Sequence, residues 1–283
     1  MTSLELKREL APVILIWSIA LVMLGLFGWI LGDILWHGVQ AISWGFLWSA
    51  PRDSGREGGI FPILVSTGWI LAVCLGVSFP LGLGTATLLS EFSYQWPQVR
   101  RWVEWSLDVL AGVPSIVFGL FGNVLFAKVL GLGFSILSGG LTLACMVLPI
   151  LIRAIQQSLN NIPAGDRRAA AALGISKLST FWVLLLPAAM PGIVVGLLLG
   201  FGRAIAETAA LIFTSGYVDR MPRSVWDSGR SLSVHIYDLA MNVAGGEPNA
   251  YATAMVLILI LVVTNTVVAS VGTWFRNRRL QRV

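Results

Sequence analysis

The fold of this chain is decided by one long apolar stretch, which reads Gly192-Ile-Val-Val-Gly-Leu-Leu-Leu-Gly-Phe-Gly-Arg203-Ala-Ile-Ala-Glu207-Thr-Ala-Ala-Leu-Ile-Phe213. Arg203 and Glu207 stand inside it, one helical turn apart. An arginine at mid-membrane depth costs about 2.5–3.5 kcal/mol on insertion scales, and such residues mark ion and substrate pathways. We therefore expect a membrane-spanning helix with a substrate pathway at Arg203, Glu207 and the adjacent Thr208.

Small residues recur at every fourth position of the same stretch: Gly192, Gly196, Gly200, Ala204 and Thr208. In membranes, such a pattern lets a second helix approach closely. Arg203 and Glu207 fall on the neighbouring face, about 100° round the helix. The pattern thus predicts tight packing on one side and polar chemistry beside it.

The composition of the chain indicates an integral membrane protein. Hydrophobic residues make up 56% of the chain and charged residues only 12%, and the mean hydropathy is +0.81. A soluble domain carries about 25% charged residues. Nucleic-acid binding is disfavoured because the lysines and arginines flank apolar segments instead of clustering on a folded surface.

Six segments are long enough to cross about 30 Å of hydrocarbon as helices. They are 13–35, 61–90, 106–128, 132–154, 180–213 and 250–275. The first is too long for the apolar region of a signal peptide, so we interpret it as an uncleaved span. The predicted fold class is an all-α integral membrane protein with about six transmembrane helices.

The distribution of positive charge predicts the orientation. If the N-terminus is cytoplasmic, lysines and arginines on the inside outnumber those on the outside by about two to one. This bias fits the positive-inside rule, so both termini are expected in the cytoplasm. We divide the chain into an N-terminal span with an outer loop (1–60) and a core domain (61–283) with a cytoplasmic loop at 160–180.

Prolines are expected to bend or interrupt several spans, because each removes a backbone hydrogen bond. Pro80 should kink the second span, and Pro114 and Pro149 lie inside the third and fourth. Pro187 and Pro191 are expected to divide the fifth segment. Residues 180–186 would then run near the inner interface, and 192–213 would make the span.

The polar segment 214–248 is expected to form an outer loop with a short amphipathic helix at 231–240. We interpret Arg220, Arg223 and Arg230 as a solvated surface. His235 is also expected at the surface, because His37 is the only other histidine and the two make no metal site. Cys74 and Cys145 lie in apolar segments and offer neither a disulfide framework nor metal-ligand spacing.

The inner loop between the fourth and fifth segments predicts a short helix. Four alanines at 169–172 followed by Leu173 favour a helix, and Gly174 is suited to its end. A rigid, slightly cationic helix at the membrane surface is a good docking element.

This loop resembles the EAA loop of ABC-transporter permeases, in the pattern Ala169-Ala170-x-x-x-Gly174 followed by Leu184-x-Leu186-Pro187. The resemblance implies a coupling helix that fits a cleft in an ATPase subunit. The residues it assigns to coupling are Asp166, Arg168, Ala170, Ala171, Leu173, Gly174 and Pro187. The glutamate of the family falls on Arg168 here.

Three further stretches resemble the phosphate-uptake permeases: 110–121, 202–209 and 232–237. The resemblance implies the fold of a type I ABC importer permease in a bacterial inner membrane. The partners it implies are a second homologous permease (PstC-like), two ATPase subunits (PstB-like) and a periplasmic phosphate-binding protein (PstS-like).

The chain is not expected to bind a cofactor or to hydrolyse ATP. A phosphate-binding Walker A loop ends in Gly-Lys-Ser or Gly-Lys-Thr, and Lys7, Lys128 and Lys177 do not fit it. ATP is thus assigned to a partner subunit. Arg203 is expected to contact phosphate transiently, with Glu207 as its counter-ion when the site is empty.

Other functions remain open at this point. Permeases for phosphonate, molybdate or sulfate would use the same arginine chemistry. A stand-alone secondary transporter often has inverted repeats, and none is evident here. An intramembrane enzyme needs a nucleophile–base pair or metal ligands, which the spans do not offer.

Overall fold

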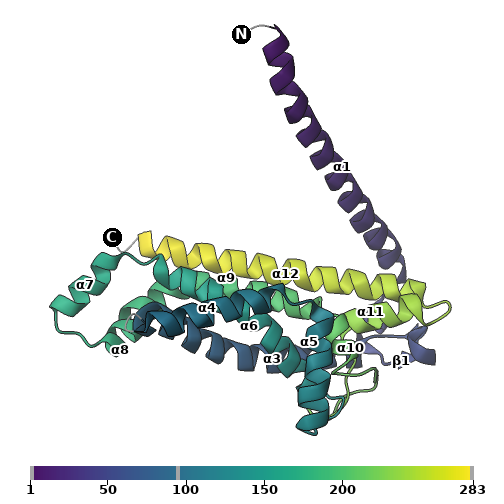
Figure 1. Cartoon of the computed structure of the whole chain (residues 1–283). Helices are drawn as coiled ribbons and strands as arrows, with labels where there is room; N and C mark the ends of the chain where they lie inside the picture. Colours follow the sequence, from purple (N-terminus) through teal and green to yellow (C-terminus); the bar gives the residue numbers. More distant parts are fainter. Residues whose placement is uncertain (1–2, 94–95, 281–283) are drawn as a thin grey trace.

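The computed structural model describes residues 3–93 and 96–280 as a helical protein (Figure 1). The long helices are α1 (Ser3–Ala41), α3 (Phe61–Thr87), α6 (Ile136–Asn160), α9 (Leu186–Ile205) and α12 (Glu247–Leu280). The π-helical turn η2 (Leu88–Phe92) extends α3, while α8 (Lys177–Thr180) and the π-helical turn η5 (Phe181–Leu185) lead into α9. Between α3 and α6 lie α4 (Pro97–Gly112), α5 (Ser115–Gly122) and the π-helical η4 (Asn123–Val129).

The remaining elements lie at the two ends of the elongated body (Figure 1). At one end are α2 (Trp44–Trp48), β1 (Pro51–Arg52), the 3-10 turn η1 (Asp53–Gly55), β2 (Glu57–Gly58), α10 (Ala209–Ile212) and α11 (Leu232–Met241). The two strands form an antiparallel hairpin in which Pro51 faces Gly58. At the opposite end lies α7 (Ala164–Ala172).

Within the described residues, five helical runs are long and apolar enough to cross a membrane. They are Pro12–Ala41, Phe61–Phe92, Ile136–Asn160, Lys177–Ile205 and Glu247–Val267. A sixth span is counted if the bent pair Pro97–Gly112 and Ser115–Val129 crosses together. The predicted fold class, an all-α membrane protein with about six spans, is confirmed.

The third predicted span, 106–128, is wrong as a single helix. The chain bends by 103° between α4 and α5. Pro114 disfavours the helical conformation in the residue before it, and Val113 is accordingly extended, with φ −70° and ψ 129°. The segment is therefore two helices that meet at a sharp angle.

The predicted division of the fifth segment is also wrong. Helical structure runs without interruption from Lys177 to Ile205 and passes through both Pro187 and Pro191. The π-helical turn η5 ends two residues before Pro187, and such local adjustments accommodate proline in membrane helices. The span ends at Ile205 rather than at residue 213.

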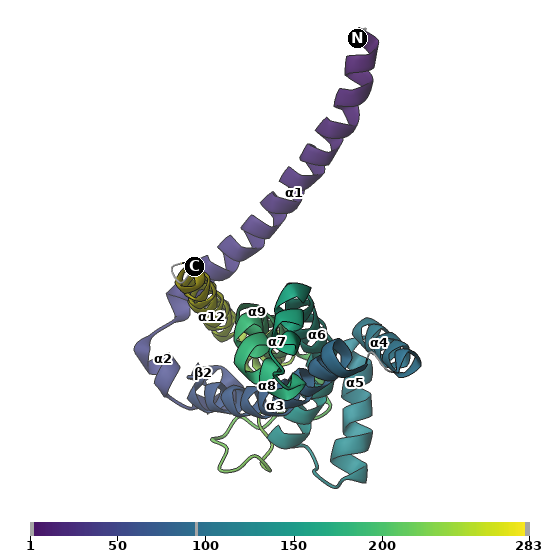
Figure 2. The same cartoon turned by 90° about the vertical axis from the view of Figure 1, so that its left-hand side faces the viewer.

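Packing of the body centres on α6. The helices α3 and α9 pack against it, and α12 packs on α9 (Figures 1 and 2). The side chains of Leu143, Val147, Leu151 and Ile155 on α6 are fully buried. Each of these residues is four positions from the next, so one continuous apolar face of α6 supplies the core.

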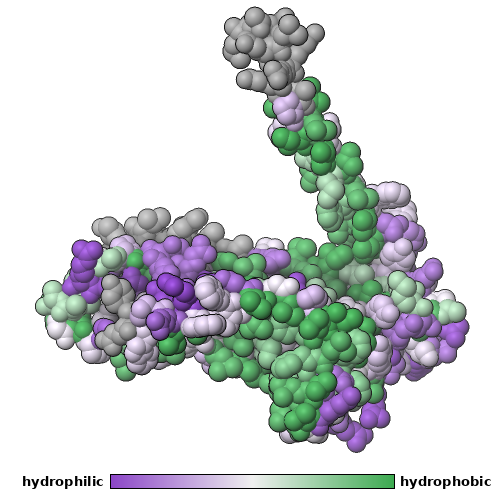
Figure 3. Space-filling model, in the orientation of Figure 1, coloured by the Kyte–Doolittle hydropathy of each residue, from purple (hydrophilic) through white to green (hydrophobic). Residues whose placement is uncertain are grey.

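Helix α1 meets the body only at the C-terminal end of the helix, and the rest of α1 extends away from the body (Figures 1 and 2). Its last turns contact α12, where the Tyr251 hydroxyl donates a hydrogen bond to Asp33 Oδ2 at 3.0 Å. The most apolar window of Pro12–Ala41 is 0% buried. Figure 3 shows apolar side chains along α1 and across the middle of the body, as expected of surfaces that face lipid or other membrane helices.

Candidate functional site

The glycine pattern of α9 packs this helix against α6. A Cβ added at Gly196 would lie 2.8 Å from Ala154 Cβ, and one at Gly200 would lie 2.7 Å from Val147 Cγ1. Gly192 similarly meets Ser158, whose hydroxyl donates to the carbonyl of Ala189 at 2.8 Å. The predicted close helix contact is thus confirmed, and α6 is the neighbouring helix.

Arg203 lies in the last turn of α9, and its side chain is exposed. Among the described residues it has no ion-pair or hydrogen-bond partner. A cation near a helix C-terminus is stabilised by about 0.3–1 kcal/mol, which offsets part of the cost of keeping it unpaired. The guanidinium is therefore available to a ligand or to a second subunit.

Glu207 lies beyond the end of α9 and is buried, with 8% of its surface exposed. Its Oε1 accepts a hydrogen bond from Ala210 N at 3.4 Å, at the start of α10. Its backbone carbonyl accepts a 2.6 Å bond from the Ser233 hydroxyl of α11. Glu207 thus holds together the helix break and the elements that follow it.

The predicted pair of Arg203 and Glu207 on one helical face is therefore wrong for this structure. The helix ends between the two residues, so their i, i+4 spacing no longer places them side by side. Thr208, directly after Glu207, is half-buried at the N-cap position of α10. Both Glu207 and Thr208 belong to the break, whereas Arg203 remains on the helix.

An exposed face of α9 connects Arg203 with the end of the body that carries α7. Val195 is 49% exposed and Leu199 is 55% exposed, and with Arg203 they recur at every fourth position. Residues four apart lie above one another on a helix. We call Val195, Leu199 and Arg203 the exposed face of α9.

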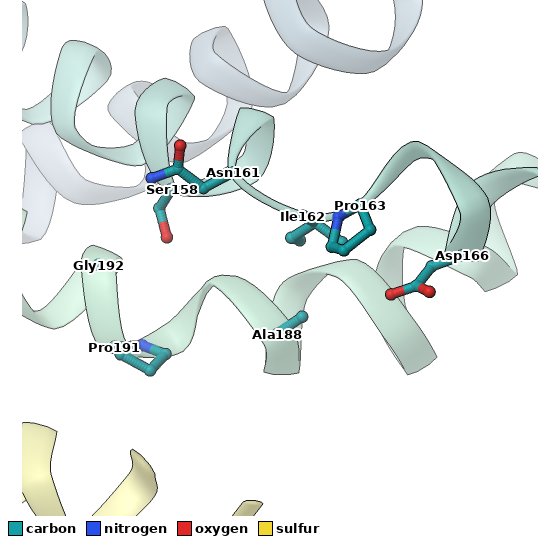
Figure 4. A pocket seen from close by; sticks show the side chains of 8 residues that line it. All are labelled: Ser158, Asn161, Ile162, Pro163, Asp166, Ala188, Pro191 and Gly192. Atoms are coloured by element: carbon teal, nitrogen blue, oxygen red, sulfur yellow. The ribbon is translucent and has the colours of Figure 1, made fainter.

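At the N-terminal end of α9, Ala188, Pro191 and Gly192 line a pocket of about 200 Å³ (Figure 4). The opposite wall of this pocket comes from the end of α6 and the start of α7. It contains Ser158, Asn161, Ile162, Pro163 and Asp166. In Figure 4 the Ser158 hydroxyl and the Asp166 carboxylate point toward the α9 segment. The pocket is thus polar on the wall that faces α9.

Helix α7 confirms the predicted helix in the inner loop. It runs from Ala164 to Ala172, and Gly174 follows with a φ of +70°, a conformation suited to glycine. Ala170 is buried, whereas Asp166, Arg168 and Ala171 are exposed. Leu173 is 78% exposed. The exposed residues present a small surface at the tip of the molecule.

Arg167, which the sequence did not single out, anchors α7 to the body. Its Nη2 forms an ion pair with Glu91 Oε1 of η2 at 2.7 Å. Its amino groups also donate to the carbonyls of Leu159 at 2.8 Å and Ile162 at 2.9 Å. The sequence feature that could have predicted this role is Glu91, a single acidic residue at the end of a long apolar run, which needs a cationic partner.

A second polar contact that the sequence did not reveal joins α4 to α6. Arg153 Nη2 lies 2.6 Å from Asp108 Oδ1 and also donates to the carbonyl of Glu104 at 3.1 Å. The Glu104 carboxylate accepts from Arg100 Nε at 2.9 Å and from Gln156 Nε2 at 3.2 Å. The bonds made by Arg153 and Gln156 hold α6 to α4 and join residues that are 45 or more positions apart in the sequence.

Arg230 and His235 are buried, so their predicted surface positions are wrong. Arg230 is 7% exposed and pairs with Asp238 of α11, at 3.0 Å between Nη1 and Oδ2. Its Nε donates to the carbonyl of Tyr217 at 2.8 Å. Arg223 and Arg220 are exposed, as expected. The buried pair of Arg230 and Asp238 connects α11 to the preceding loop. The local sequence does not reveal this connection.

His235 is 1% exposed and lies against the same arginine, with 3.2 Å between its Nδ1 and Arg230 Nη1. Burial, together with the nearby Arg230 charge, lowers the pKa of His235 to about 3, although Asp238 acts in the opposite direction. The imidazole is therefore neutral, and its Nδ1 accepts the hydrogen bond from Arg230.

Comparisons with known proteins agree with this architecture. The model of one family, described as binding-protein-dependent transport system inner membrane component, matches residues 78–281. The probable ABC transporter permease protein YqgI of Bacillus subtilis is 30% identical over 272 residues, which cover 90% of this chain and 90% of that protein. The phosphate transport system permease protein PstA 1 of Mycobacterium tuberculosis is 34% identical over 224 residues, covering 78% of this chain and 73% of that protein.

Among solved structures, an inward-facing form of the MetNI methionine ABC transporter superposes with a TM-score of 0.59. The alignment covers 77% of this chain and 94% of that chain at 15% sequence identity, and it supports the fold alone. The resemblance to phosphate-uptake permeases of ABC transporters is confirmed by the sequence matches.

Proposed function

The chain belongs to the binding-protein-dependent transport system inner membrane components, and from this premise we propose that it is the permease subunit of an ATP-driven importer of inorganic phosphate. It forms one half of the translocation pathway, and a second homologous permease forms the other half. ATP is hydrolysed by separate ATPase subunits, and a periplasmic binding protein delivers the phosphate.

The observation that carries this proposal is the unpaired guanidinium of Arg203 on an exposed helix face. Phosphate crossing a bilayer needs fixed donors to replace its water, and arginine offers a planar fork of donors that matches such oxygens. The curated relative named as a phosphate transport permease supports phosphate as the anion.

The position of Glu207 changes the role that the sequence suggested for it. Its carboxylate is bound to the backbone of Ala210 and does not neutralise Arg203 in this structure. Arg203 therefore keeps its full charge for the anion. We assign Glu207 and Thr208 to the geometry of the helix break that places Arg203, rather than to direct contact with phosphate.

The exposed face of α9 is the proposed wall of the pathway. It leads from Arg203 past Leu199 and Val195 toward the pocket that contains Asp166. An apolar wall between the arginine and the polar pocket favours release, because it offers the anion no second strong site. The facing wall belongs to the second permease.

Helix α7 is the proposed contact with the ATPase. Arg167 fixes it to both α6 and η2, so a push on α7 moves two membrane helices together. The exposed residues Asp166, Arg168, Ala171 and Leu173 form the docking surface. Ala170, Gly174 and Pro187 shape the helix and the turn that carry it.

The orientation and domain division follow the same proposal. With α7 on the ATPase side, both termini lie in the cytoplasm, in accord with the positive-inside rule. The core domain at 61–283 contains the family match at 78–281. The first 60 residues add α1 and an outer hairpin.

Arg203→Gln tests the proposal directly. In proteoliposomes that contain the complete complex, radiolabelled phosphate uptake at a fixed subsaturating concentration should fall about 10- to 100-fold, because a hydrogen bond to a charged group contributes roughly 1.5–3 kcal/mol. The matched control is Arg220→Gln in the exposed outer loop, which should keep uptake within about twofold of the unmodified complex, as expected of a surface charge.

The assay also checks assembly by recovery of all subunits after purification. Undiminished uptake by a normally assembled Arg203→Gln complex would remove Arg203 from the pathway. Competition by sulfate, molybdate and a phosphonate then tests the alternative substrates. Stronger inhibition of phosphate uptake by one of these anions than by unlabelled phosphate would reassign the cargo.

A further inference from the structure

A large apolar cavity lies outside α9, and no residue of the exposed face of α9 lines it. Its volume is about 560 Å³, and it lies among α3, α4, α5 and α6. The lining residues are Leu81, Thr85, Leu107, Leu110, Val113, Val117, Phe118, Phe121, Cys145, Leu148 and Ile152. Neither the pathway nor the coupling helix uses them.

The bend between α4 and α5 creates this cavity. The polar contacts of Arg153 hold α4 against α6, while the 103° bend after Gly112 turns α5 across the end of the space. Leu81 and Thr85 of α3 form the opposite wall. Figure 2 shows α4 set apart from α3, with α5 running across the end of α4.

The cavity is open to the apolar surface of the protein. Leu81 is 53% exposed, Leu110 is 40% exposed and Phe121 is 50% exposed. In Figure 3 the surface over α5 is apolar. Since the surrounding helices cross the membrane, the molecules that have access to this opening are lipids and membrane helices.

The shape of the cavity favours an acyl chain over a helix. A helix that crosses the full hydrocarbon layer needs about 30 Å of unobstructed groove. Because α5 lies across one end, bounded by Phe118 and Phe121, the space extends in only one direction. A lipid tail from one leaflet spans about half of the hydrocarbon layer, so it fits in the space between the open end and α5.

Cationic side chains stand beyond the open end, on the first turns of α4. Arg100 is seven residues before Leu107, which places both on one face of the helix. Only its Nε is bonded, to Glu104, and its two terminal amino groups make no hydrogen bond within 3–93 and 96–280. Arg101 has no partner in the same described ranges.

Tryptophans on the same helix mark the depth of this end. Trp102 is 67% exposed and Trp105 is 55% exposed, and they pack edge to face with 5.7 Å between ring centroids. Exposed tryptophan is typical of the membrane–water interface. Arg100 and Arg101 therefore lie at headgroup level, with the apolar cavity beneath them.

We propose that this cavity is a binding site for an anionic phospholipid, which inserts one acyl chain between α3 and α4 and places its phosphate against Arg100 and Arg101. Basic residues at the inner face of membrane helices attract anionic headgroups. The tail fills the space that the α4–α5 bend leaves open. The lipid thus supports the bend beside the fourth span.

A photoreactive lipid tests the site in the complete complex. Phosphatidylglycerol or phosphatidylcholine with a diazirine in the acyl chain is incorporated into nanodiscs of otherwise identical lipid, and labelled peptides are mapped by mass spectrometry. We expect phosphatidylglycerol to label 81–85 and 145–152, with a preference over phosphatidylcholine of about fivefold for each arginine involved.

Two variants separate the tail site from the headgroup site. Cys145→Trp fills the cavity and should abolish the labelling, whereas Val262→Trp on the exposed surface of α12 should not change it. The double variant R100Q/R101Q should keep the labelling but lose the preference for phosphatidylglycerol. Lys177→Gln is its control, because Lys177 lies at the start of another span.

Three results would overturn the proposal. One is equal labelling by the two lipids in the unmodified complex. Another is a preference for phosphatidylglycerol that survives in R100Q/R101Q. Neither arginine lines the cavity, so this double variant tests the site even if Cys145→Trp does not fold. The third is the absence of lipid labelling at 81–85 and 145–152 in the unmodified complex. None of these measurements depends on phosphate transport.

Discussion

Arg203 keeps an uncompensated charge because its helix ends within two residues of it. The sequence places Glu207 at the spacing of a helical ion pair, yet Ala206 and Glu207 leave the helix and the carboxylate caps α10 instead. The end of α9 and the start of α10 therefore meet at residues 206–208. The break, rather than a neighbouring acid, determines the surroundings of the guanidinium.

The predicted surface positions of Arg230 and His235 failed for a similar reason. A polar loop sequence with alternating charges is typical of solvated surface, but here Arg230 pairs with Asp238 from the next helix and is covered by it. The pairing depends on how α11 returns over the chain. No local pattern of residues predicts such a return.

The buried His235 makes the outer end of the molecule sensitive to acid. Its folded pKa is about 3, below the ordinary value of about 6.5, so the unfolded segment binds a proton first as the pH falls. Stability is therefore complete above pH 6.5 and decreases toward pH 3. Between pH 7 and pH 5 the local opening free energy should fall by about 2 kcal/mol.

Hydrogen exchange of peptide 231–241 in the complete complex measures this change, after correction for the intrinsic effect of pH on exchange. His235→Gln retains an acceptor for Arg230 and should remove most of the pH dependence. His37→Gln, at an exposed position of α1, should leave it intact. An unchanged pH response in His235→Gln would show that another group is responsible.

At the scale of elements, α7 acts as a rigid extension of two membrane helices. Arg167 spans the junction between α7, the end of α6 and η2. Arg168, its neighbour, is exposed. Of the two adjacent arginines, Arg167 thus attaches α7 to the body whereas Arg168 is left exposed, a distinction that the sequence alone does not reveal.

Arg167→Gln should loosen α7 without removing its exposed residues, which form the proposed docking surface. We expect amide protection in 164–172 to fall by about 10- to 100-fold, as a partly buried charged hydrogen-bond network of roughly 1.5–3 kcal/mol is lost. ATP-driven phosphate uptake should fall with it. The matched variant Arg168→Gln should leave protection unchanged, and equal protection in both variants would contradict the anchoring role of Arg167.

The long apolar segments could be predicted from the sequence, because length and hydrophobicity alone specify a membrane helix. Their interruptions were harder to predict. Pro114 breaks its segment, whereas Pro187 and Pro191 do not, since a π-helical turn precedes the latter pair. Whether a proline breaks a helix depends on which neighbouring groups satisfy the freed carbonyls.

Contacts between residues far apart in the chain were the other feature that the sequence did not predict. The alanine-rich helix α7 and the glycine face of α9 follow from local spacing. The contacts of Glu91 with Arg167 and of Asp108 with Arg153 join segments far apart in the chain. A single sequence contains no direct signal for such pairs.

At the scale of the whole molecule, the isolated chain presents surfaces that require other molecules. Most of α1 is exposed and apolar, and the exposed face of α9 contains both apolar residues and Arg203. Lipid or other membrane helices are expected to cover the first kind of surface. A charged side chain such as Arg203 is more stable beside water, an anion or a second subunit.

The most direct test asks whether the exposed face of α9 borders an aqueous pathway in the assembled complex. In a background with Cys74 and Cys145 replaced by alanine, Leu199→Cys is compared with Val262→Cys on α12 for reaction with a charged, membrane-impermeant thiol reagent during ATP turnover. The account predicts that Leu199→Cys reacts and that saturating phosphate slows the reaction, while Val262→Cys stays unreactive. An unreactive Leu199→Cys in an actively transporting complex would contradict it.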